Sequence, residues 1–265
     1  MIPERDLGKI PVLETRHLGI EFGGLTAVSE FDMTIGRTEI AGLIGPNGAG
    51  KTTVFNLITK VYQPTHGTTL LNGIDTYAMN TMQVNRAGIA RTFQNIRLFQ
   101  KMSVEDNVKV GLHNQTPYTM AEGVLRMPRY WSKERQAHER AMELLSLFHM
   151  EDMADVPAGS LPYGAQRRLE IVRALATNPS LLLLDEPAAG MNPSETAELM
   201  ENIRHIRDTF QIAIMLIEHD MSLVMGICEG ILVLNHGKII AKGTPQQIQN
   251  DPVVIEAYLG KKKEG

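Results

Sequence analysis

The sequence has few of the features that mark secreted, membrane-spanning or nucleic-acid-binding chains. Cys228 is the only cysteine, so a disulfide within the chain is impossible and we expect a reducing compartment. The longest apolar run, Ile212 to Ile217, falls far short of the roughly 18–20 residues that span a bilayer. Glu4 and Asp6 stand near the start with no apolar stretch beside them, so we expect no signal peptide.

The sequence also lacks a strong excess of charge. Its formal net charge is -4, which gives no electrostatic case for nucleic acid, so we expect no nucleic-acid partner. Hydrophobic residues make up 43% and charged residues 21%, as in ordinary soluble globular proteins. The 265 residues suffice for one large domain or two small ones. If the protein works at a membrane, another chain must hold it there.

One glycine-rich segment carries a specific chemistry. It runs Gly45, Pro46, Asn47, Gly48, Ala49, Gly50, Lys51, Thr52, Thr53 and fits the phosphate-binding pattern G-x-x-x-x-G-K-[ST]. A short apolar segment precedes it and a helical pattern follows it, which is the strand–loop–helix setting that the pattern needs. Backbone N–H groups and the helix N-terminus would bind phosphate. Lys51 would reach the β and γ phosphates, and the Thr52 hydroxyl would ligate Mg²⁺.

A second segment ends in two acids. Leu181 to Leu184 predicts a buried strand, and Asp185 and Glu186 follow it directly. By themselves these acids would be ordinary surface residues in a turn. Beside a phosphate-binding loop, Asp185 can hold the Mg²⁺ of a nucleotide, and Glu186 can orient and activate a water against the γ-phosphate.

The predicted secondary structure changes twice along the chain. Residues 1–75 predict strands and turns with a single helix, and residues 95–160 predict a helical subdomain. In that subdomain Ser103 is a predicted helix N-cap. One face of a helix at 133–150 is apolar, and residues 116–132 predict a loop. The last third alternates strands and helices, with a hairpin turn at 235–237, and alternation of this kind indicates a parallel sheet.

The segment Leu161-Pro162-Tyr163-Gly164-Ala165-Gln166 precedes a helix and points to a family. It resembles the signature motif of ATP-binding cassette (ABC) ATPases, whose common form is L-S-G-G-Q. Leu161 and Gly164 fit that form, whereas Pro162 stands in place of serine. The following Arg167-Arg168-Leu169-Glu170-Ile171-Val172-Arg173-Ala174-Leu175 is similar to the family's helix.

The resemblance assigns roles to further residues by position. Gln94 resembles the glutamine that senses Mg²⁺ and water, and His219 resembles the histidine that contacts the γ-phosphate. Phe22 stands where the family places an aromatic on adenine. As implied by the family, the catalytic set is Glu186, His219, Gln94 and Lys51, and the metal set is Thr52, Gln94 and Asp185. The nucleotide contacts are Phe22, the residues from Gly45 to Thr53, Leu161, Gly164 and Gln166.

The resemblance also implies an architecture. It is an α/β P-loop NTPase of ABC type, with a RecA-like parallel-sheet core, an N-terminal antiparallel β subdomain and an inserted α-helical subdomain. We assign 1–94 and 161–265 to the nucleotide-binding core with its β subdomain, and 95–160 to the helical subdomain, within a single ABC ATPase domain.

Several segments are similar to one group, the LivG-type ATPases of high-affinity branched-chain amino acid importers. They are Arg91 to Phe99, the Tyr-Gly signature, Ala188 to Pro193, Leu216 to Met221 and Ala257 to Gly260. This resemblance implies a second ATPase subunit (identical or paralogous), transmembrane permease subunits and, indirectly, a substrate-binding protein as partners. It implies ATP and Mg²⁺ as cofactors and a peripheral position on the cytoplasmic face of the inner membrane. Residues 93–102 and 116–132 would dock the permease.

Two other functions compete with this interpretation. Soluble ABC proteins of DNA repair or translation resemble a cassette interrupted by a long coiled coil, or two cassettes in tandem, and this sequence shows neither pattern. P-loop kinases and GTPases lack a signature segment. Co-purification with membrane proteins would separate a transporter subunit from both alternatives.

Overall fold

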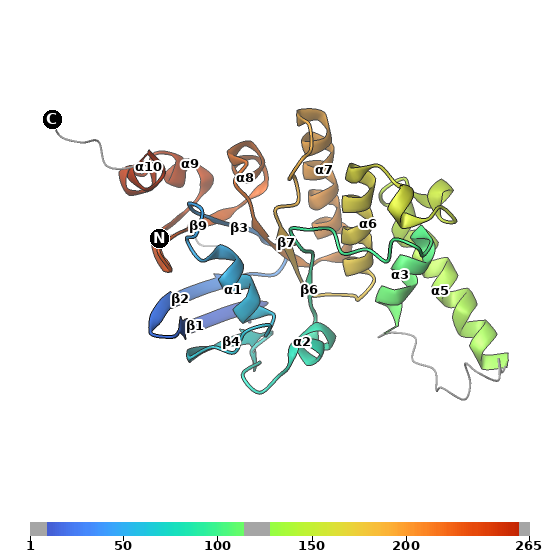
Figure 1. Cartoon of the computed structure of the whole chain (residues 1–265), viewed down its shortest axis with the longest axis horizontal. Helices are drawn as coiled ribbons and strands as arrows, with labels where there is room; N and C mark the ends of the chain where they lie inside the picture. Colours follow the sequence, from blue (N-terminus) through green and yellow to red (C-terminus); the bar gives the residue numbers. More distant parts are fainter. Residues whose placement is uncertain (1–9, 114–127, 260–265) are drawn as a thin grey trace. The chain divides into compact units, whose positions relative to one another are not determined.

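The computed structural model describes residues 10–113 and 128–259, and the chain divides into two compact units (Figure 1). The core unit comprises residues 1–91 and 180–265, and the helical unit comprises residues 92–179. The signature-like segment therefore belongs to the helical unit, whereas the sequence pattern assigns residues from 161 onward to the core.

A six-stranded sheet forms the centre of the core unit. Its strand order is β10-β9-β3-β8-β7-β6, and its pairs are parallel except for β9 with β10. The strands are β3 (Ile40–Ile44), β6 (Ile89–Arg91), β7 (Leu181–Asp185), β8 (Ala213–Ile217), β9 (Gly230–Asn235) and β10 (Lys238–Gly243). The predicted parallel sheet and the predicted hairpin at 235–237 are confirmed.

Both faces of this sheet are covered, which explains its sequence. Every residue of β3, β7 and β8 is buried. Alternate residues such as Leu181 and Leu183 belong to one hydrophobic core, and the residues between them face the other side. Strands buried on both faces are continuous apolar runs, which is why they stood out in the sequence.

A second, antiparallel sheet packs onto the first through one helix. Its order is β2-β1-β4-β5, formed by β1 (Leu13–Phe22), β2 (Leu25–Ile35), β4 (His66–Leu71) and β5 (Ile74–Asp75). Helix α1 (Lys51–Ile58) contributes Val54, Phe55, Leu57 and Ile58 to a hydrophobic core that also contains residues of both sheets. The phosphate-binding loop that precedes α1 is thus anchored on a rigid helix.

The remaining helices of the core unit are short apart from one. They are α2 (Thr81–Ala87), α7 (Pro193–Phe210), α8 (Met221–Ile227), α9 (Pro245–Gln249) and α10 (Pro252–Leu259). Helix α7 starts with a capping box in which the Asn192 side chain accepts from the Glu195 N–H at 3.0 Å. In the described part of the chain, none of the helices combines the length and apolar character needed to cross a bilayer.

The described residues of the helical unit, 92–113 and 128–179, form three helices and two 3₁₀ turns. They are α3 (Val104–Leu112), α5 (Pro128–Ser146), η1 (Glu151–Met153), η2 (Ala158–Ser160) and α6 (Tyr163–Leu175). Ser103 caps α3, as predicted, by accepting from the Asp106 N–H at 3.0 Å. Residues 128–132 are helical, so that part of the predicted loop is wrong. The rest of it, 116–127, lies outside the described residues.

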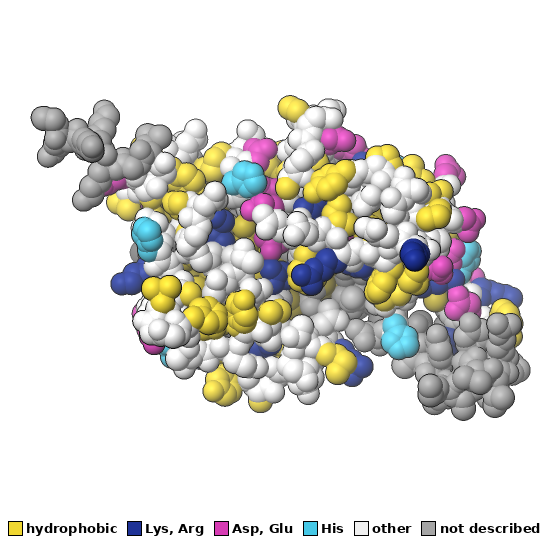
Figure 2. All heavy atoms as spheres, in the orientation of Figure 1, with side chains coloured by type: hydrophobic (Ala, Val, Ile, Leu, Met, Phe, Trp, Pro, Cys, Tyr) yellow, Lys and Arg dark blue, Asp and Glu magenta, His cyan; other side chains and the backbone are white. Residues whose placement is uncertain are grey.

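The described surface has a mixed charge. On the face drawn in Figure 2, basic and acidic side chains are interspersed and form no continuous field of one sign. A strongly charged partner would therefore meet no single-sign surface on that face.

Candidate nucleotide site

The phosphate-binding loop begins where β3 ends, and its glycines are required by the backbone. Gly45 has a φ of 154°, and a Cβ there would lie 2.1 Å from the carbonyl oxygen of Leu234. Gly50 has a φ of 104° and is the N-cap of α1, where it provides no capping side chain. The first N–H groups of α1 are therefore left for an anion, as phosphate sites at helix N-termini require.

Lys51 folds back over the loop that precedes it. Its Nζ donates to the carbonyl oxygens of Gly45 at 2.7 Å and Pro46 at 3.1 Å. Burial lowers the pKa of Lys51, while Glu186 and Asp185 oppose this shift through their negative charge. The ammonium thus lies in the electrostatic field of Asp185, the last residue of β7, and of Glu186, which follows it. A bound phosphate would compete with the two carbonyl groups for this ammonium.

The turn between β9 and β10 supports the loop from the other side. The Gly237 N–H donates to the carbonyl oxygen of Ala49 at 2.9 Å, and the Gly237 carbonyl accepts from the Ser29 N–H at 2.9 Å. A Cβ at Gly237 would lie 2.5 Å from the Ala27 carbonyl oxygen. Sequence reasoning saw only a hairpin turn here, because the contact joins residues almost 190 positions apart.

Asp185 is almost completely buried at the end of β7, and Arg91 holds one of its oxygens. The Arg91 Nη2 lies 2.8 Å from Asp185 Oδ2, with the two side chains 7% and 4% exposed. The Arg91 Nη1 donates to Asn56 Oδ1 on α1 at 2.7 Å, and the guanidinium carbon lies 5.4 Å from the centroid of the Phe55 ring. The sequence analysis missed Arg91 as a contact of this site.

Glu186 and His219 come together beyond the ends of β7 and β8. The distance from His219 Nδ1 to Glu186 Oε1 is 3.8 Å, and the Glu186 N–H donates to the Ile217 carbonyl at 2.9 Å. Glu186 has a φ of 48°, which is unusual for a residue with a side chain. Residues held in this backbone region gather at functional sites.

Glu218 joins the two loops of this corner, and sequence reasoning assigned no role to it. The side chain is 1% exposed. Its Oε1 accepts from the Ala188 N–H at 2.8 Å, and its Oε2 accepts from the N–H groups of His219 at 2.9 Å and Asp220 at 3.2 Å. A carboxylate with three backbone donors fixes the loop after β7 to the loop after β8. An acid directly after a buried strand was the signal that could have found it.

Phe22 lies at the end of β1 and is 46% exposed. Its ring meets that of Tyr62 edge to face, with centroids 5.3 Å apart and planes at 76°. The pair leaves part of the Phe22 ring accessible, as the predicted stacking on adenine requires. Tyr62 was not among the predicted site residues.

The other predicted site residues lie in the helical unit. Gln166 donates through Nε2 to the Leu161 carbonyl at 2.8 Å, which closes the turn before α6, and Gly164 lies in the first turn of this helix. The Arg167 guanidinium donates to the backbone carbonyls of Phe93 (2.6 Å) and Gln94. The helical unit therefore holds the Gln94 segment against the helix of the signature-like segment.

Comparison with known proteins decides the family. The ABC transporter family matches residues 28–189, and the branched-chain amino acid ATP-binding cassette transporter family matches residues 238–264. This chain is an ABC transporter ATP-binding protein.

Its relatives share almost the full length of this cassette. It is 47% identical over 94% of its length to the high-affinity branched-chain amino acid transport ATP-binding protein LivG of Escherichia coli K12, and covers 98% of that protein. It is 44% identical, with the same coverage, to BraF of Pseudomonas aeruginosa, which has the same description. The structure of MJ1267, an ATP-binding cassette in its ADP conformation, is 27% identical and superimposes with a TM-score of 0.82 over 96% of this chain and 100% of MJ1267. The predicted fold class and family are confirmed.

The C-terminal family match adds a contact that the sequence analysis did not interpret. Within it, Tyr258 on α10 lies beside the backbone of Gly45, the first residue of the cassette's phosphate-binding loop. Burial raises the pKa of Tyr258. Tyr258 had been noted only as part of a family-like ending. The C-terminal helix thus reaches the nucleotide site.

The donor set fits a magnesium ion. Thr52 offers an exposed hydroxyl in the first turn of α1, and Asp185 offers a carboxylate at the end of β7. Both are oxygen donors, which Mg²⁺ prefers, and Mg²⁺ sites commonly combine one or two such protein ligands with phosphate oxygens. Gln94 lies in the helical unit, so its part in a metal site stays a prediction.

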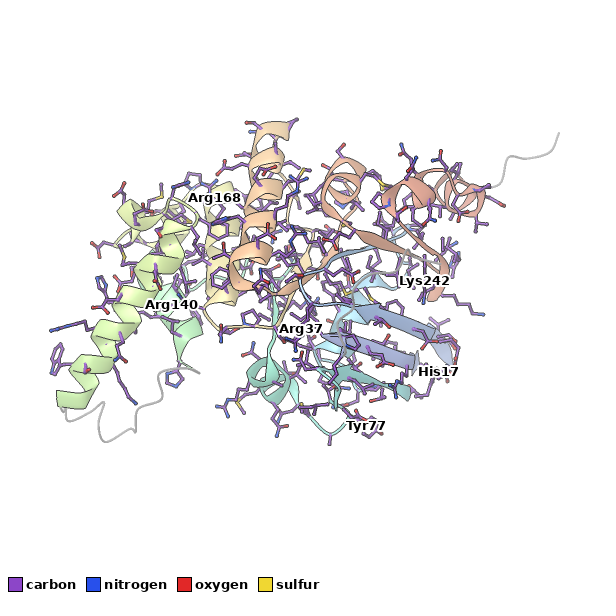
Figure 3. The ribbon with its side chains drawn as sticks, turned by 180° about the vertical axis from the view of Figure 1, so that it is seen from behind. His17, Arg37, Tyr77, Arg140, Arg168 and Lys242 are labelled. Carbon is purple, nitrogen blue, oxygen red and sulfur yellow. The ribbon has the colours of Figure 1, made fainter. Side chains whose placement is uncertain are left out.

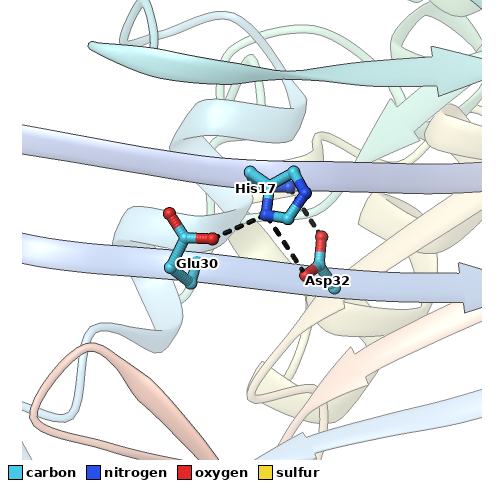
Figure 4. Close-up of side chains that lie close together, drawn as sticks. All are labelled: His17, Glu30 and Asp32. Carbon is cyan, nitrogen blue, oxygen red and sulfur yellow. Dashed lines mark hydrogen bonds and ion pairs between the residues drawn. The ribbon is translucent and has the colours of Figure 1, made fainter.

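A different cluster lies on the cassette's antiparallel sheet (Figure 4). His17 Nδ1 lies 2.6 Å from Glu30 Oε2 and 3.8 Å from Asp32 Oδ2, and the His17 N–H donates to Asp32 Oδ1 at 2.6 Å. The hydrogen bond with Glu30 raises the pKa of His17. The side chains of His17 and Glu30 are largely exposed, and that of Asp32 is half-buried. The cluster joins β1 to β2, and we assign it to the stability of this hairpin.

Proposed function

We propose that this cassette hydrolyses ATP to energise the import of branched-chain amino acids through a membrane permease. The observation that carries the proposal is the corner where Glu186 and His219 meet, in the electrostatic field of Lys51. The substrate class rests on the LivG and BraF relatives and on the match at 238–264.

The geometry supports a division of labour. Backbone N–H groups at the start of α1 and the Lys51 ammonium bind the phosphates, and Phe22 stacks on the adenine. Glu186 orients a water toward the γ-phosphate and accepts its proton. His219 is held by the backbone pairing with Glu218 and donates to the γ-phosphate. A positioned general base contributes roughly 10²–10⁴-fold to a rate.

Thr52 and Asp185 would hold Mg²⁺, with Gln94 as a further ligand. When bound, the ion supplies positive charge that offsets the charge developing on the transferred phosphoryl group. The buried position of Asp185 keeps its carboxylate in one orientation for this purpose.

We further propose a second cassette, identical or paralogous, and permease subunits as partners. Helix α6 starts at Tyr163 after Pro162, which provides no capping side chain. Its first N–H groups are thus suited to a phosphate held by the partner cassette, as Leu161, Gly164 and Gln166 imply by resemblance. These partnerships place the cassette on the cytoplasmic face of the inner membrane.

The test replaces Glu186 by Gln in the reconstituted transporter. We expect steady-state ATP hydrolysis to fall by about 10²–10⁴-fold, because the amide cannot accept the proton, while ATP affinity changes by no more than a few-fold. The matched control is Glu201→Gln, an exposed acid on α7 of the same unit, which should leave both quantities unchanged. Full turnover in Glu186→Gln would refute the assignment. Failure of the wild-type chain to co-purify with membrane subunits would favour a soluble ABC ATPase instead.

A further inference from the structure

Arg91 is the residue whose contacts link the two elements that carry the proposed metal ligands. One guanidinium nitrogen binds Asp185 at the end of β7 (2.8 Å), and the other binds Asn56 on α1 (2.7 Å). Asn56 lies four residues after Thr52, so the two lie on the same face of α1.

We propose that Arg91 is a positioning residue for Mg²⁺ binding, which sets the orientation of Asp185 and its spacing from α1. The proposal rests on the function proposed above. Arg91 donates to Asp185 Oδ2 at 2.8 Å, and this charge-assisted hydrogen bond sets the orientation of the carboxylate at the end of β7. The planar guanidinium fixes two acceptors in one geometry, which an ammonium cannot do.

The surroundings of Arg91 restrict its own movement. Its side chain is 7% exposed and lies over the ring of Phe55, which is completely buried in the hydrophobic core. Arg91 ends β6, which pairs in parallel with β7, so its backbone is fixed to the strand that carries Asp185. It is also the last residue before the chain enters the helical unit, three residues before Gln94. A side chain held in this way can transmit orientation to the carboxylate that it binds.

Two roles of Arg91, as a positive charge and as a support for Asp185, predict opposite changes in metal affinity when Arg91 is replaced. Measuring that affinity therefore separates the two roles. If Arg91 acted only through its positive charge, it would repel the cation, and Arg91→Met would bind metal more tightly while Arg91→Lys would bind as the wild type does. If it orients Asp185, both variants bind metal more weakly. Loss of the partner that orients a metal ligand typically lowers metal affinity by roughly 10–100-fold.

The experiment measures Mn²⁺ affinity of the full-length chain saturated with ADP, by electron paramagnetic resonance, and ADP affinity in EDTA by calorimetry. We expect Arg91→Lys and Arg91→Met to lower Mn²⁺ affinity by roughly 10–100-fold, with ADP affinity in EDTA within twofold of the wild type. Asn56→Ala, which keeps the Asp185 contact, should show a smaller loss. The matched control is Arg207→Lys, which changes a surface arginine that binds Glu229 and Asp208 in the same unit.

Three results would overturn the proposal. The first is unchanged or tighter Mn²⁺ binding in both Arg91 variants. The second is a parallel loss of ADP affinity in EDTA, which would make Arg91 a support of the whole site rather than of the metal. The third is a wild-type chain whose ADP complex holds no Mn²⁺, and this result alone would also refute the proposed magnesium site. Arg91→Lys and Asn56→Ala keep the test decisive if Arg91→Met does not fold.

Discussion

Replacing Arg167 by Ala should destabilise the helical unit strongly, because it would break the buried ion pair with Glu170. The Glu170 carboxylate would keep the Arg97 N–H (3.1 Å) and the more distant Arg173 beside it. Arg167 and Glu170 are 2% and 1% exposed, and Arg167 Nη1 lies 3.3 Å from Glu170 Oε2. Breaking a buried ion pair from one side costs about 3–5 kcal/mol. Arg173 Nη2 remains 3.8 Å from Glu170 Oε1, so we expect a value near the lower end, about 3 kcal/mol.

A second substitution identifies the cause of this loss. Adding Glu170→Gln to Arg167→Ala removes the buried charge, and we expect it to recover at least about 1 kcal/mol, the cost of leaving a buried polar group unpaired. The pH dependence has a defined sign. Burial already raises the pKa of Glu170, and loss of Arg167 raises it further. The folded state therefore binds the Glu170 proton more tightly than the unfolded state does, so the destabilisation should be full at neutral pH and shrink as the pH falls through the raised pKa.

The assay is urea unfolding of the full chain followed by fluorescence of Trp131, the only tryptophan, which lies on α5 of the helical unit. A loss of about 3 kcal/mol corresponds to a midpoint lower by about 1–3 M urea. The control is Arg140→Ala (Figure 3), which breaks an exposed Arg–Glu pair of the same i,i+3 spacing on α5 and should cost less than about 1 kcal/mol. Equal midpoints for Arg167→Ala and Arg140→Ala, or no recovery on adding Glu170→Gln, would show that the buried pair does not stabilise the helical unit.

Three further predictions concern the partner surface, the loop contact and the hairpin. Phe99→Asp should abolish co-purification with the permease while ATP binding survives, because Phe99 is 48% exposed and anchor residues of an interface contribute about 2 kcal/mol or more. Intact assembly would show that residues 93–102 do not dock the permease. Tyr258→Phe should speed amide hydrogen exchange at Gly45 by roughly 2- to 12-fold, the value of one hydrogen bond, and unchanged exchange would contradict the contact. The raised pKa of His17 means that its pairing with Glu30 stabilises the hairpin fully below about pH 6.5 and is lost as the pH rises through the folded-state pKa. An NMR titration should show this pKa falling in Glu30→Gln, and no difference would refute the pairing.

Local signals predicted most of the fold. Strands buried on both faces, such as Leu181 to Leu184, are continuous apolar runs, and the capping residues Ser103 and Asn192 mark helix starts through contacts within three residues. The helix at 133–150 was placed correctly by its apolar face, but its ends were not, because it starts at Pro128 and ends at Ser146. Helix ends depend on a few weak local contacts, which a periodic pattern does not contain.

The phosphate-binding loop and the two acids at the end of β7 could be identified from the sequence, because their chemistry depends on neighbours within a few residues. The distant residues that hold these groups in place are visible only in the folded chain. Arg91 reaches Asp185 across 94 positions, and Gly237 supports Ala49 across 188. Such partners carry no local pattern, since their approach is set by the order of strands in the sheet and by the packing of α1. The structure therefore adds to this cassette the side chains that orient the predicted ones.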